Sequence, residues 1–349
     1  MIKCDYFGKC GGCFYSNSNE EDYKNSQEEL LKSINSTEID PEWIWVGPNL
    51  RRKITLQLTA TNQLGFFKEK SKEIIEINRC PIATTKISDF LPKLQQLLQK
   101  LPHKVIKQVS ITQFDNCLSL IFYLINDLEF TQNAKVISFA RQNNCNISTQ
   151  QDGETAPLIK LQNNQIKINN HTLNLNPDIF IQATQTGLDK IVEIITHELK
   201  SRSDIKNVAD IYSGFGIYSF AISKIVKNVS CYEGSLDMTN LTKENVKLNR
   251  ITNILANRRD VFQQPLERRV LNRFDLALIN PPRNGATPQV KEIARSELKN
   301  LIYVSCNPKT FFSDTQILLN AGFKVKKLYA LDQFYLTKHL EVIGVFTKK

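Results

Sequence analysis

Beyond Asn176-Pro177, strand-like and helix-like segments alternate along the chain, and this alternation restricts the fold more than any other feature. Apolar runs typical of buried strands occur at 208–212, 229–232, 274–279 and 301–304, and helical patterns at 187–200, 217–226 and 235–248. Such an order indicates βαβ units and a parallel sheet. We therefore predict an α/β fold, with a doubly wound, Rossmann-like sheet in the C-terminal half.

The region before residue 177 has a different pattern. Polar and apolar residues alternate at 53–59 and 165–169, as in half-buried strands, and 118–125 is a continuous apolar strand. Leucines and Phe90 recur at helical spacing over 87–101, where we expect one helix that Ser88 could cap. We predict an antiparallel α+β domain at 1–177 and the α/β domain at 178–349.

Three predicted strands of the C-terminal half end in loops that carry polar groups. These loops are Asp210-Ile211-Tyr212-Ser213-Gly214-Phe215-Gly216, Asn280-Pro281-Pro282-Arg283 and Ser305-Cys306-Asn307-Pro308. Ligands of doubly wound sheets bind beyond the carboxyl ends of the strands, so the three loops are expected to form one site. A single cysteine at a strand end usually packs as a small hydrophobe. The series of loops favours a functional role for Cys306.

The Gly214-Phe215-Gly216 turn lies between a strand and a helix, where glycine allows a ligand to approach the backbone. Glu233 ends the following strand, at the position that binds ribose hydroxyls in such folds. This pair fits a dinucleotide dehydrogenase as well as an S-adenosylmethionine site. Ser219 replaces the third glycine of the dinucleotide motif, which favours the methyl donor because that ligand has no pyrophosphate. Asp260 could bind an adenine amino group or lie on the surface.

The chain has a formal net charge of +10 and a pI near 9.1, which indicates an anionic partner, most commonly nucleic acid. Its N-terminus lacks the apolar core of a signal peptide, and no run approaches the length of a membrane span. We expect a soluble, cytoplasmic protein.

Four cysteines form a pattern of their own: Cys4, Cys10, Cys13 and, much later, Cys80. Disulfides are rare in the cytoplasm, so four thiols favour a tetrahedral zinc site or an iron–sulfur cluster. Their spacing does not separate the two. Another three cysteines, Cys117, Cys145 and Cys231, follow no ligand pattern and are expected to be packing residues.

Five ordered motifs together resemble the family of RNA uracil-C5 methyltransferases over essentially the whole chain. They are the three strand-end loops, Phe180-Ile181-Gln182 and His339-Leu340-Glu341. The resemblance implies a class I S-adenosylmethionine-dependent methyltransferase domain, with Cys306 as nucleophile and Glu341 as base. By the same resemblance, the cofactor pocket would contain Gln182, Tyr212, Glu233 and Asn280, and a [4Fe-4S] cluster would bind to Cys4, Cys10, Cys13 and Cys80.

Uracil chemistry accounts for the two catalytic side chains. Uracil C5 is a weak nucleophile, but a thiolate that adds to C6 converts the ring into an enolate that is nucleophilic at C5. A carboxylate must then remove the C5 proton so that the cysteine can leave. A base within structured RNA must also be extruded and held, for which Phe180, Phe334 and Tyr335 are candidates, although each would ordinarily be a core residue. His339 could orient Glu341 or face solvent.

The substrate is expected to be 23S ribosomal RNA. Asn280 stands where many family members have Asp, and the chain begins with the cysteines expected to bind the cluster. In both features it resembles the 23S member of the family that lacks an N-terminal oligonucleotide-binding (TRAM) domain. We expect a monomer. The alternative substrate for the same chemistry is tRNA. Two less favoured functions are methylation of an exocyclic amine, suggested by Asn280-Pro281-Pro282, and a non-catalytic role in RNA folding.

Overall fold

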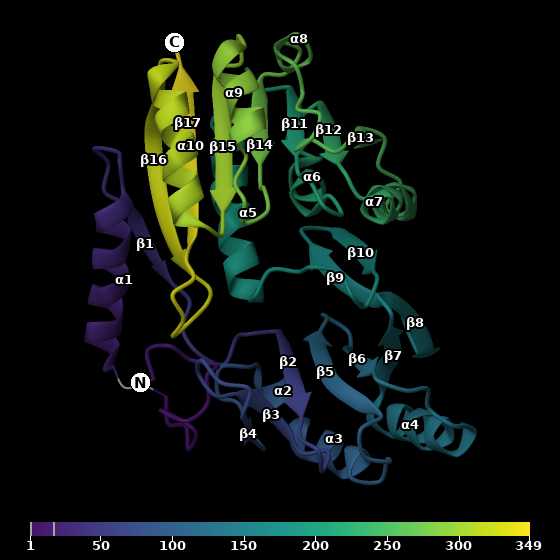
Figure 1. The fold of residues 1–349 in the computed structure, drawn as a ribbon. Coiled ribbons are helices and arrows are strands. Elements are labelled where there is room, and N and C mark those ends of the chain that lie inside the picture. Colours follow the sequence, from purple (N-terminus) through teal and green to yellow (C-terminus); the bar gives the residue numbers. More distant parts are fainter. Residues whose placement is uncertain (1, 17) are drawn as a thin grey trace.

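The computed structural model describes residues 2–16 and 18–349. Figure 1 shows two sheets, one above the other, joined by a short hairpin. The upper sheet has the order β1-β16-β17-β15-β14-β11-β12-β13, the lower sheet has the order β4-β3-β2-β5-β6-β7-β8, and the hairpin is β9-β10. The alternating C-terminal segments thus form the predicted α/β sheet.

The upper sheet contains β1 (Glu42–Trp45), β11 (Asn207–Ile211), β12 (Asn228–Glu233), β13 (Ile254–Arg258), β14 (Leu276–Ile279), β15 (Asn300–Ser305), β16 (Phe323–Asp332) and β17 (Glu341–Lys348). Strands β11 to β15 run parallel, whereas β17 is antiparallel to both β15 and β16. Alternate residues of each strand face opposite cores: Leu278 and Ile302 face one, Ala277 and Leu301 the other. Burial on both faces explains the continuous apolar runs in the sequence.

Helices cover both faces of this sheet (Figure 1). One core includes side chains of α5 (Gln185–Lys200), α6 (Ile217–Ile222) and α7 (Leu236–Leu248), and the other those of α1 (Glu20–Ile34), α8 (Arg268–Leu271), α9 (Thr287–Arg295) and α10 (Pro308–Asn320). This arrangement confirms the doubly wound sheet. No helix in the described part of the chain has the length and apolar character needed to cross a bilayer.

The lower sheet contains β2 (Lys53–Leu58), β3 (Leu64–Phe67), β4 (Ile74–Glu76), β5 (Ile106–Gln113), β6 (Leu118–Leu124), β7 (Cys145–Gln151) and β8 (Glu154–Ile159). It is antiparallel except for β6 and β7, which run parallel because α4 (Phe130–Asn143) connects them. The single helix expected at 87–101 is instead α2 (Thr85–Ser88) followed by α3 (Leu91–Leu98), which has a proline in its first turn. Thr84 caps α2, and the Ser88 hydroxyl accepts from the Cys80 N–H.

Two N-terminal segments pack with the C-terminal sheet, which the predicted division at residue 177 does not anticipate. Strand β1 pairs in parallel with β16, and Leu31 of α1 lies in the core beneath α10. The hairpin of β9 (Asn164–Ile168) and β10 (His171–Leu175) packs against α6 and α7. Hydrophobic periodicity identifies strands but does not specify a partner almost 300 residues away. The boundary at 177 itself stays a prediction.

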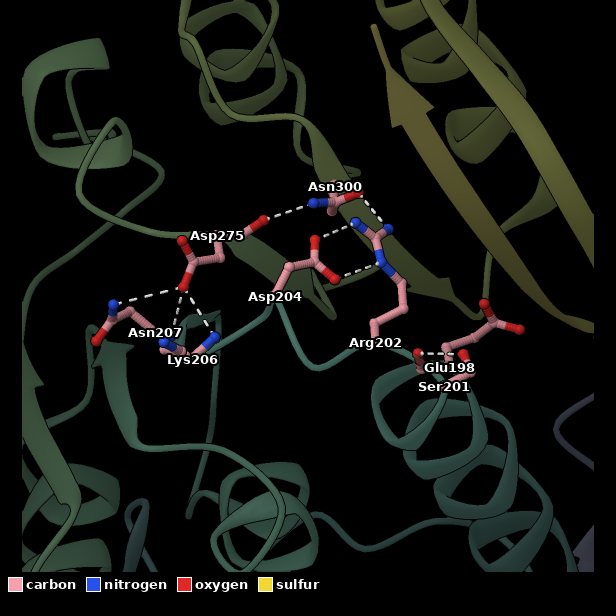
Figure 2. Close-up of polar contacts among 8 residues, drawn as sticks. All are labelled: Glu198, Ser201, Arg202, Asp204, Lys206, Asn207, Asp275 and Asn300. Carbon is pink, nitrogen blue, oxygen red and sulfur yellow. Dashed lines mark hydrogen bonds and ion pairs between the residues drawn. The ribbon is translucent and has the colours of Figure 1, made fainter.

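A polar network fixes the amino ends of the parallel strands (Figure 2). Arg202, after α5, donates to Asp204 (2.7 Å) and to the Asn300 side-chain oxygen at the start of β15 (2.6 Å). Asn300 in turn donates to the backbone oxygen of Asp275 (2.8 Å), and the Asp275 carboxylate accepts the backbone N–H of Asn207 (2.8 Å). The network joins β11, β14 and β15 at one edge and leaves the opposite, carboxyl edge for ligands.

Candidate active site

A cavity of about 610 Å³ lies at the carboxyl edge of the C-terminal sheet. Its wall includes every residue predicted for catalysis or cofactor binding, namely Gln182, Tyr212, Glu233, Asn280, Cys306 and Glu341. The structure therefore brings the three strand-end loops into one site, as the parallel topology predicts.

Cys306 and Glu341 come from adjacent strand ends. Ser305, the last residue of β15, pairs with Val342, so Cys306 follows directly after β15 where Glu341 begins β17. Asn307 caps α10 and its side-chain nitrogen donates to the backbone oxygen of Arg283 (2.9 Å), which links the cysteine loop to the Asn280–Arg283 loop. The surface position considered for Glu341 is excluded, because only 2% of this residue is exposed.

The electrostatics of the two side chains differ. Burial raises the pKa of the Cys306 thiol and the nearby Glu341 raises it further, whereas the Arg283 guanidinium lowers it. Burial raises the pKa of Glu341 to about 7. A carboxyl group that titrates near neutral pH can both accept and release a proton under physiological conditions. Glu341 thus has a pKa suited to a general base, and the Cys306 thiol lies beside a cation that favours its ionised form.

A chain of buried amides connects the two sides of the cavity. The Nε2 of Gln333 donates to a Glu341 carboxylate oxygen (2.9 Å) and to the Gln182 side-chain oxygen (2.8 Å). Gln182 in turn donates to the Tyr218 hydroxyl (3.0 Å). Neither Gln333 nor Tyr218 could be identified from the sequence, because both are outside the five motifs named above. The only signal was the position of Gln333, directly after a strand that ends at Asp332.

The cofactor side of the cavity is built around Glu233. Its two carboxylate oxygens accept the backbone N–H groups of Gly214 (3.0 Å) and Ser235 (2.8 Å), and each oxygen keeps a lone pair for a ligand hydroxyl. Gly216 has φ of 81°, a conformation that favours glycine. Ser219 donates to the buried Asp210 carboxylate (2.6 Å), which explains why a serine replaces the glycine of the dinucleotide motif. The side chains fit an adenosine ligand.

Asp260 is both exposed and part of the cavity wall, so the two alternatives weighed for it are compatible. One of its oxygens accepts the N–H groups of Phe262 and Gln263, which fixes the loop after β13. His339 is exposed, near the Phe334 ring, and is not part of the wall.

The three aromatic candidates have different environments. Phe180 is 65% exposed and lines the cavity, so the expectation that it is a core residue is wrong. Tyr335 is buried against Tyr23 and is a core residue. Phe334 is half-buried.

Cys4, Cys10, Cys13 and Cys80 line a second cavity, of about 280 Å³. Among residues 2–16 and 18–349, no three histidine, cysteine or acidic side chains lie close enough together to hold a metal ion. Burial and the neighbouring thiols raise the pKa of Cys13 to about 12. The Gly12 N–H donates to the Cys10 sulfur (3.4 Å), and Arg51 also lines the cavity. The wall of this cavity thus contains four thiols, one of which accepts an amide N–H, together with Arg51.

The remaining cysteines, Cys117, Cys145 and Cys231, are buried, each at most 1% exposed, as expected for packing residues.

Comparisons with known proteins place the chain among RNA methyltransferases. The model of the family described as tRNA (uracil-5-)-methyltransferase matches residues 59–349. The 23S rRNA (uracil(1939)-C(5))-methyltransferase of Haemophilus parainfluenzae is 28% identical over 99% of this chain and 82% of its own length. An uncharacterised RNA methyltransferase of Mesorhizobium japonicum is 30% identical over 99% of this chain and 84% of its own length.

The fold is also similar to that of a solved structure, the Pyrococcus abyssi tRNA (uracil-54, C5)-methyltransferase in complex with S-adenosyl-L-homocysteine. The TM-score is 0.78 with 18% identity, over 97% of this chain and 86% of the other. This similarity confirms a class I methyltransferase fold.

Proposed function

The chain belongs to the tRNA (uracil-5-)-methyltransferase family of S-adenosylmethionine-dependent RNA uracil-C5 methyltransferases, and from this premise we propose that it converts a uridine of 23S ribosomal RNA into 5-methyluridine. The observation that carries the proposal is the meeting of Cys306 and Glu341 in the wall of one cavity, at the ends of adjacent strands.

S-adenosylmethionine, when bound, supplies the methyl group as an electrophile. Glu233 would hold its ribose hydroxyls, since both carboxylate oxygens have free lone pairs. Gln182, Tyr212 and Asn280 lie in the same wall, and Tyr212 carries a buried hydroxyl without a partner among the described residues. A bound polar ligand would satisfy this hydroxyl.

Cys306 would act as the nucleophile. Its thiolate adds to uracil C6, the C5=C6 electron pair moves into the ring as an enolate, and C5 becomes able to accept the methyl group. Arg283 favours the thiolate, since it lowers the pKa that burial raises. Of the three aromatic candidates, Phe180 is the one that lines the cavity, and it could stack on an extruded base.

Glu341 would complete the reaction. It removes the proton from methylated C5, the C–H electrons re-form the C5=C6 bond, and the C6–S pair returns to sulfur as the thiolate. Methylation of an exocyclic amine would require neither Cys306 nor Glu341. A non-catalytic RNA-folding factor would not require a thiol and a carboxyl group at adjacent strand ends in one cavity. Both alternatives are therefore less well supported than uracil methylation.

The 23S substrate is supported by the names of relatives that match 99% of the chain, and the net charge of +10 suits an RNA partner. The same chemistry on tRNA is the alternative, since the family description names tRNA. A ribosomal RNA substrate would place the enzyme in the cytoplasm. We propose that it acts there as a monomer. Residues 1–177 would form an RNA-binding part and residues 178–349 the catalytic part.

The four-cysteine cavity is proposed to hold a [4Fe-4S] cluster on Cys4, Cys10, Cys13 and Cys80. A cluster would keep the thiolates ionised and would tie the N-terminal loop to the loop after β4. Anaerobically purified protein should contain about four irons per chain and be brown. Cys13→Ser should lose the iron, whereas Cys117→Ser should retain it, and a colourless protein with one zinc would exclude the cluster.

The function is tested by mapping 5-methyluridine in 23S RNA and tRNA from cells with and without this protein. Cells that lack it are also complemented with the wild-type protein or with Cys306→Ala. We expect one 23S position to lose its methyl group without the protein and with Cys306→Ala. Loss in tRNA alone would redirect the proposal to tRNA, and unchanged 5-methyluridine in both RNAs would refute it.

A further inference from the structure

Gln333 lies directly after β16, is 1% exposed, and is not part of the cavity wall. Its single amide nitrogen donates to the Glu341 carboxylate (2.9 Å) and to the Gln182 side-chain oxygen (2.8 Å). An ionised carboxylate only accepts hydrogen bonds, so the amide nitrogen is the end of Gln333 that suits ionised Glu341. Gln333 therefore touches both the base and a residue of the cofactor wall.

Packing holds this amide in place. Gly187 of α5 lies against it: a Cβ built on Gly187 would come within 2.7 Å of the Gln333 side-chain oxygen and 2.9 Å of its Cβ. The side-chain oxygen of Gln333 has no hydrogen-bond partner among the described residues. The two donated bonds and the contact with Gly187 thus determine the orientation of the amide.

We propose that Gln333 is a positioning residue for the abstraction of the C5 proton. Its amide orients the Glu341 carboxylate, favours the ionised form of this group, and links it to Gln182 on the cofactor side. The inference rests on the proposed function, because it assigns Gln333 to one step of that reaction. It predicts that removal of the amide slows elimination more than it slows methyl transfer.

The surroundings of Glu341 explain why one amide has this effect. The titratable or charged groups that share its surroundings are Cys306 directly after β15, Tyr218 of α6, and Arg52 and Arg283 in the cavity wall. Gln333 is the residue that donates to the carboxylate. Burial raises the pKa of Glu341, the bond from Gln333 opposes this rise, and the resulting pKa is about 7. Without this bond, burial acts unopposed and the pKa of Glu341 rises.

The test is Gln333→Met, which keeps the side-chain length and removes the donor. With purified protein and a 23S RNA fragment, single-turnover methyl transfer should stay within about threefold of wild type. The covalent RNA–protein adduct should accumulate, and the pH of half-maximal elimination should rise by about one unit, a tenfold change in ionised base.

Two further variants separate this role from a general effect on folding. Gly187→Ala should displace the amide and give a weaker form of the same upward shift. Gln289→Met removes an equally buried glutamine that bonds to Leu266 outside the cavity. It should lower the thermal unfolding temperature without accumulation of adduct or a change in the pH profile.

Failure of the role proposed for Gln333 can be distinguished from failure of the proposed uracil methylation. If wild type forms no 5-methyluridine, the proposed function fails. If wild type is active and Gln333→Met shows an unchanged pH profile and no accumulated adduct, only the role of Gln333 is refuted.

Discussion

Cys306 and Glu341 are 35 positions apart in the sequence, yet they lie at the meeting point of two antiparallel strand ends, one residue beyond the Ser305–Val342 pair. This register follows from the insertion of β17 between β15 and β16. A final antiparallel strand brings a carboxylate to the carboxyl edge of an otherwise parallel sheet. The thiol and the carboxyl group therefore lie in the wall of the same cavity.

Turnover should rise with pH through neutrality. The pKa of Glu341 is raised to about 7, so at pH 6 about one tenth of this carboxyl group is ionised and able to remove a proton. The raised pKa of Cys306 acts in the same direction, since thiolate also increases with pH. We expect the multiple-turnover rate at saturating RNA to increase at least tenfold from pH 6 to pH 8. A rate that is flat over this range would contradict the assignment of either group.

Glu341→Gln should stabilise the fold at high pH. The folded-state pKa of about 7 exceeds the ordinary value of 4.5, so the folded protein binds the extra proton, and the stability from this group is lost as pH rises through 7. The free energy of unfolding of the variant should therefore exceed that of wild type by about 1–3 kcal/mol at pH 8 and equal it at pH 4.5. Urea unfolding at the two pH values measures this, and equal stability at pH 8 would be inconsistent with a buried, charged Glu341.

Arg283→Met should slow the formation of the thiolate adduct by about tenfold at pH 7, because Arg283 lowers the pKa of Cys306. The bond from Asn307 uses the backbone oxygen of Arg283 and would survive the substitution. The loss should diminish at pH 9, where the thiolate forms without help. Rapid-quench measurement at saturating RNA provides the rate. Arg295→Met, at the end of α9, should behave as wild type, and a loss that does not depend on pH would point to RNA binding instead.

Arg202→Ala tests the network at the amino ends of the strands (Figure 2). It removes the bond to the Asn300 side chain and should lower the free energy of unfolding by about 1 kcal/mol, since the arginine is only partly buried. Binding of S-adenosylhomocysteine should be unchanged, because the cavity is at the opposite edge. Lys190→Ala, which breaks the exposed pair with Glu193, should have no measurable effect on stability. Chemical unfolding and calorimetric titration distinguish the two results.

The strand-end motifs could be located from the sequence because buried parallel strands are continuous apolar runs and their carboxyl ends share one edge. This placed Cys306, Asn280 and Tyr212 together without any knowledge of contacts. Gln333 could not be identified in this way. Its role depends on its contact with Gly187 and its bonds to Glu341 and Gln182, and a buried glutamine after a strand has no distinctive spacing.

Long-range pairing was equally inaccessible. Strand β1 has only four residues, and its partner β16 begins at Phe323. The exposure of Phe180 also depends on tertiary structure, since an aromatic residue beside Ile181 is ordinarily part of a core. The break between α2 and α3 could have been anticipated from Pro92, which favours the first turn of a helix.

The most direct test of the account is the covalent bond between Cys306 and uracil. Glu341→Gln should be mixed with a 23S RNA fragment and S-adenosylmethionine, denatured, and analysed by gel electrophoresis and mass spectrometry. The account predicts an adduct between Cys306 and a methylated uridine that resists denaturation, and no adduct in the double variant with Cys306→Ala. Methylated RNA released by the Cys306→Ala single variant at the wild-type rate would contradict it.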